Sequence, residues 1–159
     1  VNHVVPKEQL DAKAEWLIGR LVDKSPSAIR RGKYALRALG AMDFDAAIAK
    51  VTEALKQEGF GILTEIDLQA ALKNKLGVDF RKYKILGACN PPFAHQAVTA
   101  EPHIGTMLPC NVIVQEHAPG QVEVSAVDPV ASMMAVKNEG LGAIAGEVRD
   151  KLKRVVEGL

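Results

Sequence analysis

The segment from Cys110 to Val127 constrains the fold of this chain most strongly. Two runs rich in β-branched residues, Cys110–His117 and Gln121–Val127, flank the tripeptide Ala118-Pro119-Gly120. Such runs are typical of strands, and a short connection with proline and glycine is typical of a tight turn. The segment therefore predicts a β-hairpin. A long helical pattern follows it at 141–157, and this order favours an α+β fold over a doubly wound parallel sheet.

Apolar periodicity predicts the remaining elements. Phe60–Ile66 alternates in a way that indicates a strand, and Tyr83–Cys89 has the same interpretation. Helical spacing predicts helices at about 6–21, 27–39, 43–58, 67–76, 93–99 and 141–157. The segment Tyr34–Leu39 also fits a strand, so its assignment stays open. We expect a mainly antiparallel sheet with helices packed on it, the last helix covering one face, plus an N-terminal helical extension.

Composition limits the classes of function. Twenty basic against nineteen acidic residues leave a net charge of +1, so electrostatics give no reason to expect nucleic acid or a membrane as a partner. Two cysteines among 159 residues, no secretion signal and no apolar run of the roughly 20 residues that span a bilayer indicate the cytoplasm. The first residue is Val1 and not methionine, which suggests a fragment or a processed chain.

Both cysteines lie where an apolar run meets a proline turn, in the sequences CNPP and LPC. One interpretation of Cys89 and Cys110 is that they are small buried fillers. Another is a reactive thiol pair, with His95 as the base that would lower a thiol pKa. A metal or heme site with His103 is a third, but no spacing matches a known zinc motif, so we assign no metal ligand.

Further residues around the two junctions are candidates for ligand contact. They are Asn90, Phe93, His103, Met107 and Asn111. The amides have an alternative role as caps of the local backbone, the histidine as a loop residue and the methionine as a core residue. Apolar neighbours at both junctions predict a pocket for a small, partly apolar molecule.

Most of the chain, from about Met42 to the end, resembles the family catalogued as domain of unknown function 302. The resemblance rests on residues 53–98, which include ILGACNPPFAHQAV, and on the pieces IGTMLPCNVIVQE and VSAVDP. It implies a compact α+β fold that often forms a homodimer. It implies no activity, because the family is defined by having none assigned.

Residues 1–40 resemble the C-terminal tail of the enoyl-CoA hydratase (crotonase) family, through VVP and KSPSAIRRGK. In that family the tail is helical and packs at subunit contacts. The family's catalytic carboxylate and oxyanion hole lie upstream of this tail, so we expect no hydratase activity. The resemblances divide the chain into a helical extension, 1–40, and an α+β domain, 41–159.

We therefore expect a cytoplasmic domain, with no assigned cofactor, that binds a small ligand at the two junctions. Two alternatives remain at this point. One is a thiol-dependent redox or sulfur-transfer enzyme that uses Cys89 or Cys110 as its nucleophile. The other is a structural or assembly module whose helical N-terminus docks on a partner.

Overall fold

The computed structural model describes residues 35–133, 136 and 138–159, with side chains described from Ala41 onward. The described residues belong to one unit, Ala35–Leu159. The helices expected before residue 35, and most of the crotonase-like extension, lie outside the described residues.

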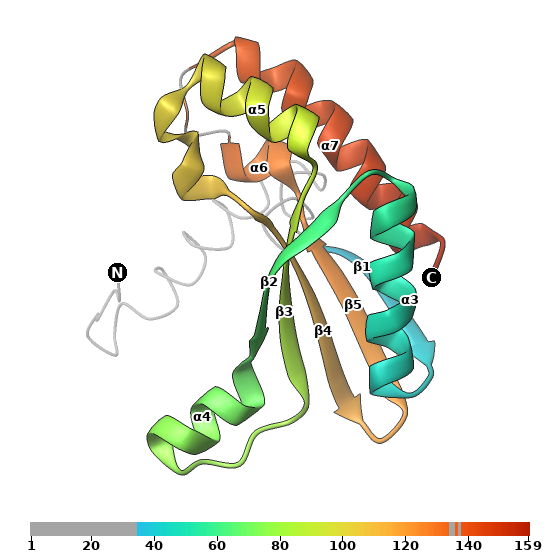
Figure 1. Ribbon diagram of the computed structural model, residues 1–159. Coiled ribbons are helices and arrows are strands. Elements are labelled where there is room, and N and C mark those ends of the chain that lie inside the picture. Colours follow the sequence, from blue (N-terminus) through green and yellow to red (C-terminus); the bar gives the residue numbers. More distant parts are fainter. Residues whose placement is uncertain (1–34, 134–135, 137) are drawn as a thin grey trace, which may run out of the picture. The chain divides into compact units, whose positions relative to one another are not determined.

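A five-stranded antiparallel sheet, in the order β1-β5-β4-β3-β2, is the centre of this unit (Figure 1). Its strands are β1 (Ala35–Ala41), β2 (Gly61–Asp67), β3 (Tyr83–Cys89), β4 (Cys110–Ala118) and β5 (Gln121–Val127). The helices are α3 (Phe44–Gln57), α4 (Leu68–Leu76), α5 (Pro91–Ala100), α6 (Pro129–Met133) and α7 (Gly140–Glu157), with a 3₁₀ helix, η2, at Pro102–Met107. The α+β prediction is confirmed.

The predicted hairpin is confirmed as β4–β5. The two strands pair from Val112 opposite Ala126 to Ala118 opposite Gln121, and the turn contains Gly120 at φ 76°. Glycine adopts this left-handed conformation without the steric cost that a side chain brings. The strands predicted at 60–66 and 83–89 and the helix at 141–157 are confirmed within one residue at each end.

The segment after residue 34 is a strand, so the strand alternative for Tyr34–Leu39 is confirmed from Ala35 onward and the helix over 27–39 is wrong for its last residues. Strand β1 pairs along its whole length with β5, from Ala35 opposite Val127 to Ala41 opposite Gln121. Its sequence, ALRALGA, consists largely of good helix formers. The backbone groups on the free side of β5 need partners, and this long-range pairing outweighs the local helix preference.

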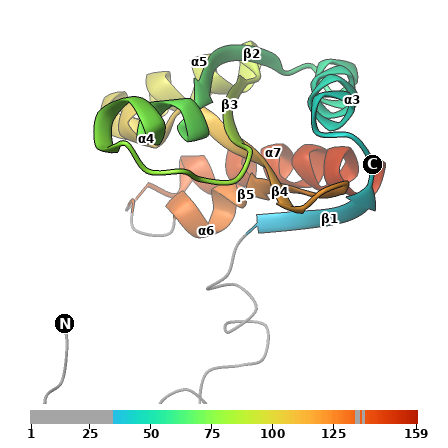
Figure 2. The same ribbon diagram turned by 90° about the horizontal axis from the view of Figure 1, so that it is seen from below.

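Helices α3 and α7 cover one face of the sheet. Figure 2 shows both on the same side of β1, β4 and β5. Val51 and Leu55 of α3 and Leu152 of α7 are fully buried against Val112 and Val114 of β4 in the main core. Asp43 caps α3 by accepting hydrogen bonds from Asp45 N and Ala46 N at 2.9 and 3.2 Å. Among the described residues, no helix combines the length and apolarity needed to cross a bilayer.

The other face of β4 and β5 carries a hydrogen-bonded polar row. Gln115 Nε2 and Ser125 Oγ donate to Glu123 Oε1 at 3.1 and 2.8 Å, and His117 Nε2 lies 3.0 Å from Glu123 Oε2. Arg81, stacked over the Phe80 ring, donates through Nε and Nη2 to Gln115 Oε1. The buried polar atoms of this row therefore have the partners that burial demands.

Candidate functional site

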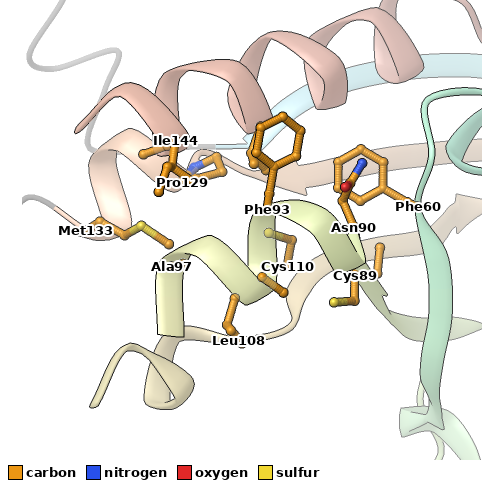
Figure 3. A pocket seen from close by; sticks show the side chains of 14 residues that line it. Phe60, Cys89, Asn90, Phe93, Ala97, Leu108, Cys110, Pro129, Met133 and Ile144 are labelled. Carbon is orange, nitrogen blue, oxygen red and sulfur yellow. The ribbon is translucent and has the colours of Figure 1, made fainter. Parts of the chain in front are cut away.

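A narrow apolar cleft lies where β3 ends and β4 begins. Side chains from the sheet, α5, α6 and α7 line it, and Figure 3 shows these fourteen residues. The cleft is about 30 Å³, which is room for about two water molecules. It opens outward, and the empty space is about 370 Å³ when the part open to solvent is counted. None of the described lining residues carries a charge, so this part of the cleft is suited to an apolar group.

The lining residues fall into two groups. The CNP and LPC junctions contribute Cys89, Asn90, Phe93, Leu108 and Cys110. The remaining side chains are small or apolar and come from other parts of the chain: Phe60, Ala88, Ala94, Ala97, Pro129, Met133, Ile144, Ala145 and Val148. Helix α7 contributes Ile144, Ala145 and Val148 to this second group. The apolar spacing of the sequence predicted the helix, but it did not indicate which of its residues would line the cleft.

Asn90 is the polar side chain of the cleft. It precedes α5, yet its side chain does not cap that helix; instead Nδ2 donates to the backbone carbonyl of Glu58 at 3.3 Å. The residue is 8% exposed. Gly59, at φ 85°, leaves space for the amide, since a Cβ at Gly59 would lie 3.0 Å from Asn90 Nδ2. Among the described residues, Asn90 Oδ1 accepts no hydrogen bond, and no fully enclosed side-chain atom lacks a partner, so this oxygen is not completely enclosed.

Glu58 is held in place by two cations of α7. Arg154 Nε and Nη2 donate to its two carboxylate oxygens at 2.8 and 2.7 Å, and Lys151 Nζ donates to its backbone carbonyl at 3.2 Å. The hydrogen bond from Arg154 lowers the pKa of the Glu58 carboxyl. Because the same carbonyl accepts from Asn90, these contacts fix the turn against which the amide rests.

The two cysteines approach the cleft from different faces of the sheet. Cys110 lies directly opposite Ala88 in the β3–β4 ladder, so the two share the face that α3 and α7 cover. Cys89 follows Ala88, and consecutive strand residues point to opposite faces. Figure 3 accordingly shows Phe60 and Asn90 on the α7 side of β3 and the Cys89 side chain on the other side.

Both thiols are free, and burial raises the pKa of each. The pKa of Cys110 rises from 9.0 to about 11, mainly through burial and further through the charge that Cys89 would carry. At neutral pH the cleft therefore holds neutral thiols, which are weaker nucleophiles than thiolates.

The other candidate residues lie outside the lining of the cleft. His95 is exposed on α5, and His103 is exposed and bonded to Glu101. Met107 is 40% exposed, and Asn111 is exposed on β4. Of the residues singled out in the sequence, the structure thus brings together both cysteines, Asn90 and Phe93. Within residues 35–133, 136 and 138–159, no three His, Cys, Asp or Glu side chains are placed to hold a metal ion.

Comparison with known proteins addresses the family. No curated protein matches the chain. The crystal structure of an uncharacterized conserved DUF302 protein from Bacillus stearothermophilus is similar, with a TM-score of 0.72 and 25% sequence identity over 79% of this chain and 97% of that one. The family model "Domain of unknown function DUF302" matches residues 37–159. With this match over most of its length, the chain belongs to the DUF302 family.

Proposed function

We propose that this domain binds a small, partly apolar ligand in the cleft between the end of β3, α5 and α7. The observation that carries the proposal is one polar atom without a hydrogen-bond partner among the described residues, Asn90 Oδ1, in an otherwise apolar lining. Ligand sites commonly combine apolar walls with a few well-placed polar groups. A fully packed core would leave neither the space nor the unpaired oxygen.

The size of the cleft limits what enters it. About 30 Å³ admits a methyl- or hydroxyl-sized group, and the rest of a ligand would lie in the open part. Met133 lines the cleft, and the unbranched thioether of methionine adapts its shape at low cost. A ring-sized ligand would need this side chain to move aside.

A thiol-dependent enzyme is the weaker alternative. A nucleophilic cysteine needs a nearby positive charge to lower its pKa, whereas burial raises the pKa of both thiols here. His95, the base that the sequence offered, is exposed and does not line the cleft. The thiols act better as soft, neutral lining than as nucleophiles.

Methionine-methyl NMR tests the binding proposal. The chain has four methionines, and Met133 lines the cleft while Met42 packs against the main core. Toluene, as a simple apolar probe, is expected to shift the Met133 methyl signal in a saturable way and to leave that of Met42 in place.

The matched variants both place leucine on α5. Ala94→Leu fills the cleft from a half-buried lining position, and Ala100→Leu makes the same change at an exposed position. We expect Ala94→Leu to abolish the shift and Ala100→Leu to keep it. A wild-type protein whose Met133 signal responds to no small molecule would refute the proposal.

Self-association is a separate proposal. Strand β2 lies at one edge of the sheet, and Leu63 and Ile66 on β2 and Leu76 on α4 are 66%, 47% and 68% exposed. An edge strand offers unpaired backbone groups, and exposed apolar side chains add a reason for a second copy to cover it. Light scattering is expected to give a dimer that Leu63→Lys dissociates and that the control Val98→Lys, on exposed α5, retains. A wild-type monomer at micromolar concentration would contradict this proposal.

The expectation of no hydratase activity stays a prediction. Crotonyl-CoA should give no turnover, because none of these 159 residues aligns with the family's catalytic carboxylate or oxyanion hole. Turnover that a point mutation in this chain abolishes would overturn it.

A further inference from the structure

We infer that the ligand of the cleft is electrically neutral and presents an O–H or N–H donor to Asn90 Oδ1. The inference rests on the proposed binding function and specifies its ligand class: an alcohol, a phenol or a primary amide. Three features of the cleft carry it, namely the orientation of the amide, the absence of charge in the lining and the nature of the α5 N-terminus.

The orientation of the Asn90 amide is set by Glu58. Nδ2 donates to the Glu58 carbonyl, so the end that remains available is an acceptor. The reverse orientation would set Oδ1 against the carbonyl oxygen, placing two acceptors together without a proton between them. Lys151 Nζ already donates to that carbonyl and, with Arg154, fixes its position. A ligand that hydrogen-bonds to this amide must therefore supply the donor, which Asn90 Oδ1 accepts.

Among the residues that the structure describes, the cleft offers a charged ligand no counter-charge. No Asp, Glu, Lys, Arg or His is among the lining residues. The nearby cations Lys151 and Arg154 are already bonded to Glu58, and the Glu58 carboxylate is bonded to them in turn. Removing a carboxylate or an ammonium group from water without a partner is strongly unfavourable. Carboxylates and amines are thus excluded by the same arrangement.

The N-terminus of α5 does not supply an anion site either. A helix N-terminus binds anions through its first free N–H groups. In α5 the first two residues, Pro91 and Pro92, have no N–H, and Ala94 N already donates to the Asn90 carbonyl at 2.9 Å. Only Phe93 N is left of the groups that normally hold a phosphate or a carboxylate. The double proline thus removes an attraction for anions at the mouth of a neutral cleft.

Three probes of similar shape and different chemistry test the inference: phenol, toluene and benzoate. Binding is followed through the Met133 methyl signal in each case. Phenol should bind about fivefold more tightly than toluene, the ratio expected from one additional net hydrogen bond. Benzoate, of similar size but charged, should give no saturable shift.

Matched asparagine variants assign the difference to one atom. Asn90→Ala removes the acceptor and should bring the phenol-to-toluene ratio to about one, because toluene does not use the amide. Asn111→Ala changes the asparagine of the other junction, which is exposed on β4, and should leave the ratio unchanged. If Asn90→Ala does not fold, the affinities of the three probes for the wild-type chain still test the neutral-donor inference.

The outcomes separate the inference from the function on which it rests. Equal affinity for phenol and toluene, or preferred binding of benzoate, overturns the neutral-donor inference while the cleft remains a binding site. If none of the three probes binds to the wild-type chain, the binding function itself is refuted. A phenol preference that Asn90→Ala removes and Asn111→Ala retains supports both.

Discussion

Cys110 lies directly opposite Ala88 across the β3–β4 ladder, and this pairing sends the side chain of the next residue, Cys89, to the opposite face of the sheet. A disulfide requires the two Cβ atoms to approach within roughly 4.5 Å and to point toward each other. Cys89 and Cys110 face opposite sides of the sheet, so they do not meet that condition unless the backbone moves. The shared location of the two thiols is therefore not the geometry of a disulfide.

We predict that the folded chain forms no internal disulfide. Treatment of native protein with diamide should leave both thiols open to alkylation after the protein is unfolded, as measured by mass spectrometry. Under native conditions a thiol reagent should label half-buried Cys89 before buried Cys110, because reaction requires access as well as ionisation. An intact mass that shows a Cys89–Cys110 bond after mild oxidation would contradict this and revive the redox alternative.

Stability should fall at alkaline pH because of Cys110. Its pKa rises from 9.0 to about 11 in the folded protein, so the folded state binds the proton more tightly than the unfolded state does. The corresponding stabilisation is fully present below pH 9 and is lost as pH rises toward 11. Its total size, on the order of 2–3 kcal/mol, follows from the shift.

Cysteine-to-alanine variants measure this contribution by urea unfolding at a series of pH values. Cys110→Ala should lose about 1–3 kcal/mol at pH 7 as a small buried truncation, and should lose less additional stability between pH 9 and 11 than the wild type does. Cys89→Ala, at a half-buried position, is the control and should cost less than Cys110→Ala at neutral pH. Parallel pH profiles of wild type and Cys110→Ala would show that the thiol is not buried as described.

The elements with a clear period were predictable from the sequence, whereas β1 could not be distinguished from a helix. The hairpin and α7 each repeat their apolar residues at one spacing, 2 for the strands and about 3.6 for the helix. The sequence ALRALGA has no single period, and its strand conformation comes from pairing with β5, at least 80 residues later. The helix propensity of the segment, about 2 kcal/mol in total, is small beside that pairing. The local sequence pattern of 35–41 carries no information about its partner strand, β5.

Part of the cleft was also predictable. The end of β3 and the start of β4 are antiparallel neighbours, so the CNP and LPC junctions must meet at one end of the sheet. Which side chains face the cleft depends on the register, because a shift of one residue reverses every side chain of a strand. The sequence therefore indicated both cysteines but not their opposite faces. The contribution of α7 to the lining could not be predicted either, because its lining residues lie more than 30 residues beyond Cys110 in the sequence.

Of the two strand glycines whose surroundings the structure describes, Gly61 and Gly87, Gly87 has the less room for a side chain. A Cβ there would lie 2.2 Å from Thr64 Oγ1 and 2.7 Å from Pro109 Cγ. We predict that Gly87→Ala costs about 1–3 kcal/mol of unfolding free energy, because both neighbours would have to move. Gly61→Ala, on the adjacent strand with nothing within 4 Å of its Cβ, is the control and should change stability by less than about 0.5 kcal/mol.

A double-mutant cycle identifies the cause. Thr64→Ala removes the nearer obstacle but leaves Pro109, so Gly87→Ala should cost less in that background while still costing something. An equal cost in both backgrounds would assign the effect to Pro109 or to the backbone instead of to the threonine.

The ion pair of Glu58 and Arg154 should make stability depend on acidic pH. The hydrogen bond from Arg154 lowers the pKa of Glu58 below its ordinary 4.5, so the folded state favours the ionised carboxyl. The stabilisation is fully present above pH 4.5 and is lost as pH falls through the lowered pKa. Glu58→Gln should therefore reduce stability at pH 7 by about 0.5–1 kcal/mol, a modest value because Arg154 is largely exposed. Urea unfolding should show the difference from wild type shrinking as the carboxyl protonates.

The same variant separates the charge of Glu58 from its backbone. Glu157→Gln, which removes a largely exposed pair with Lys153, is the control and should change stability less at every pH. Glu58→Gln keeps the carbonyl that accepts from Asn90 Nδ2, so the orientation of the Asn90 amide and the phenol-to-toluene ratio should persist. A ratio that falls to one in Glu58→Gln would mean that the ion pair, and not the carbonyl alone, holds the turn at 58–60 in the position that orients the amide.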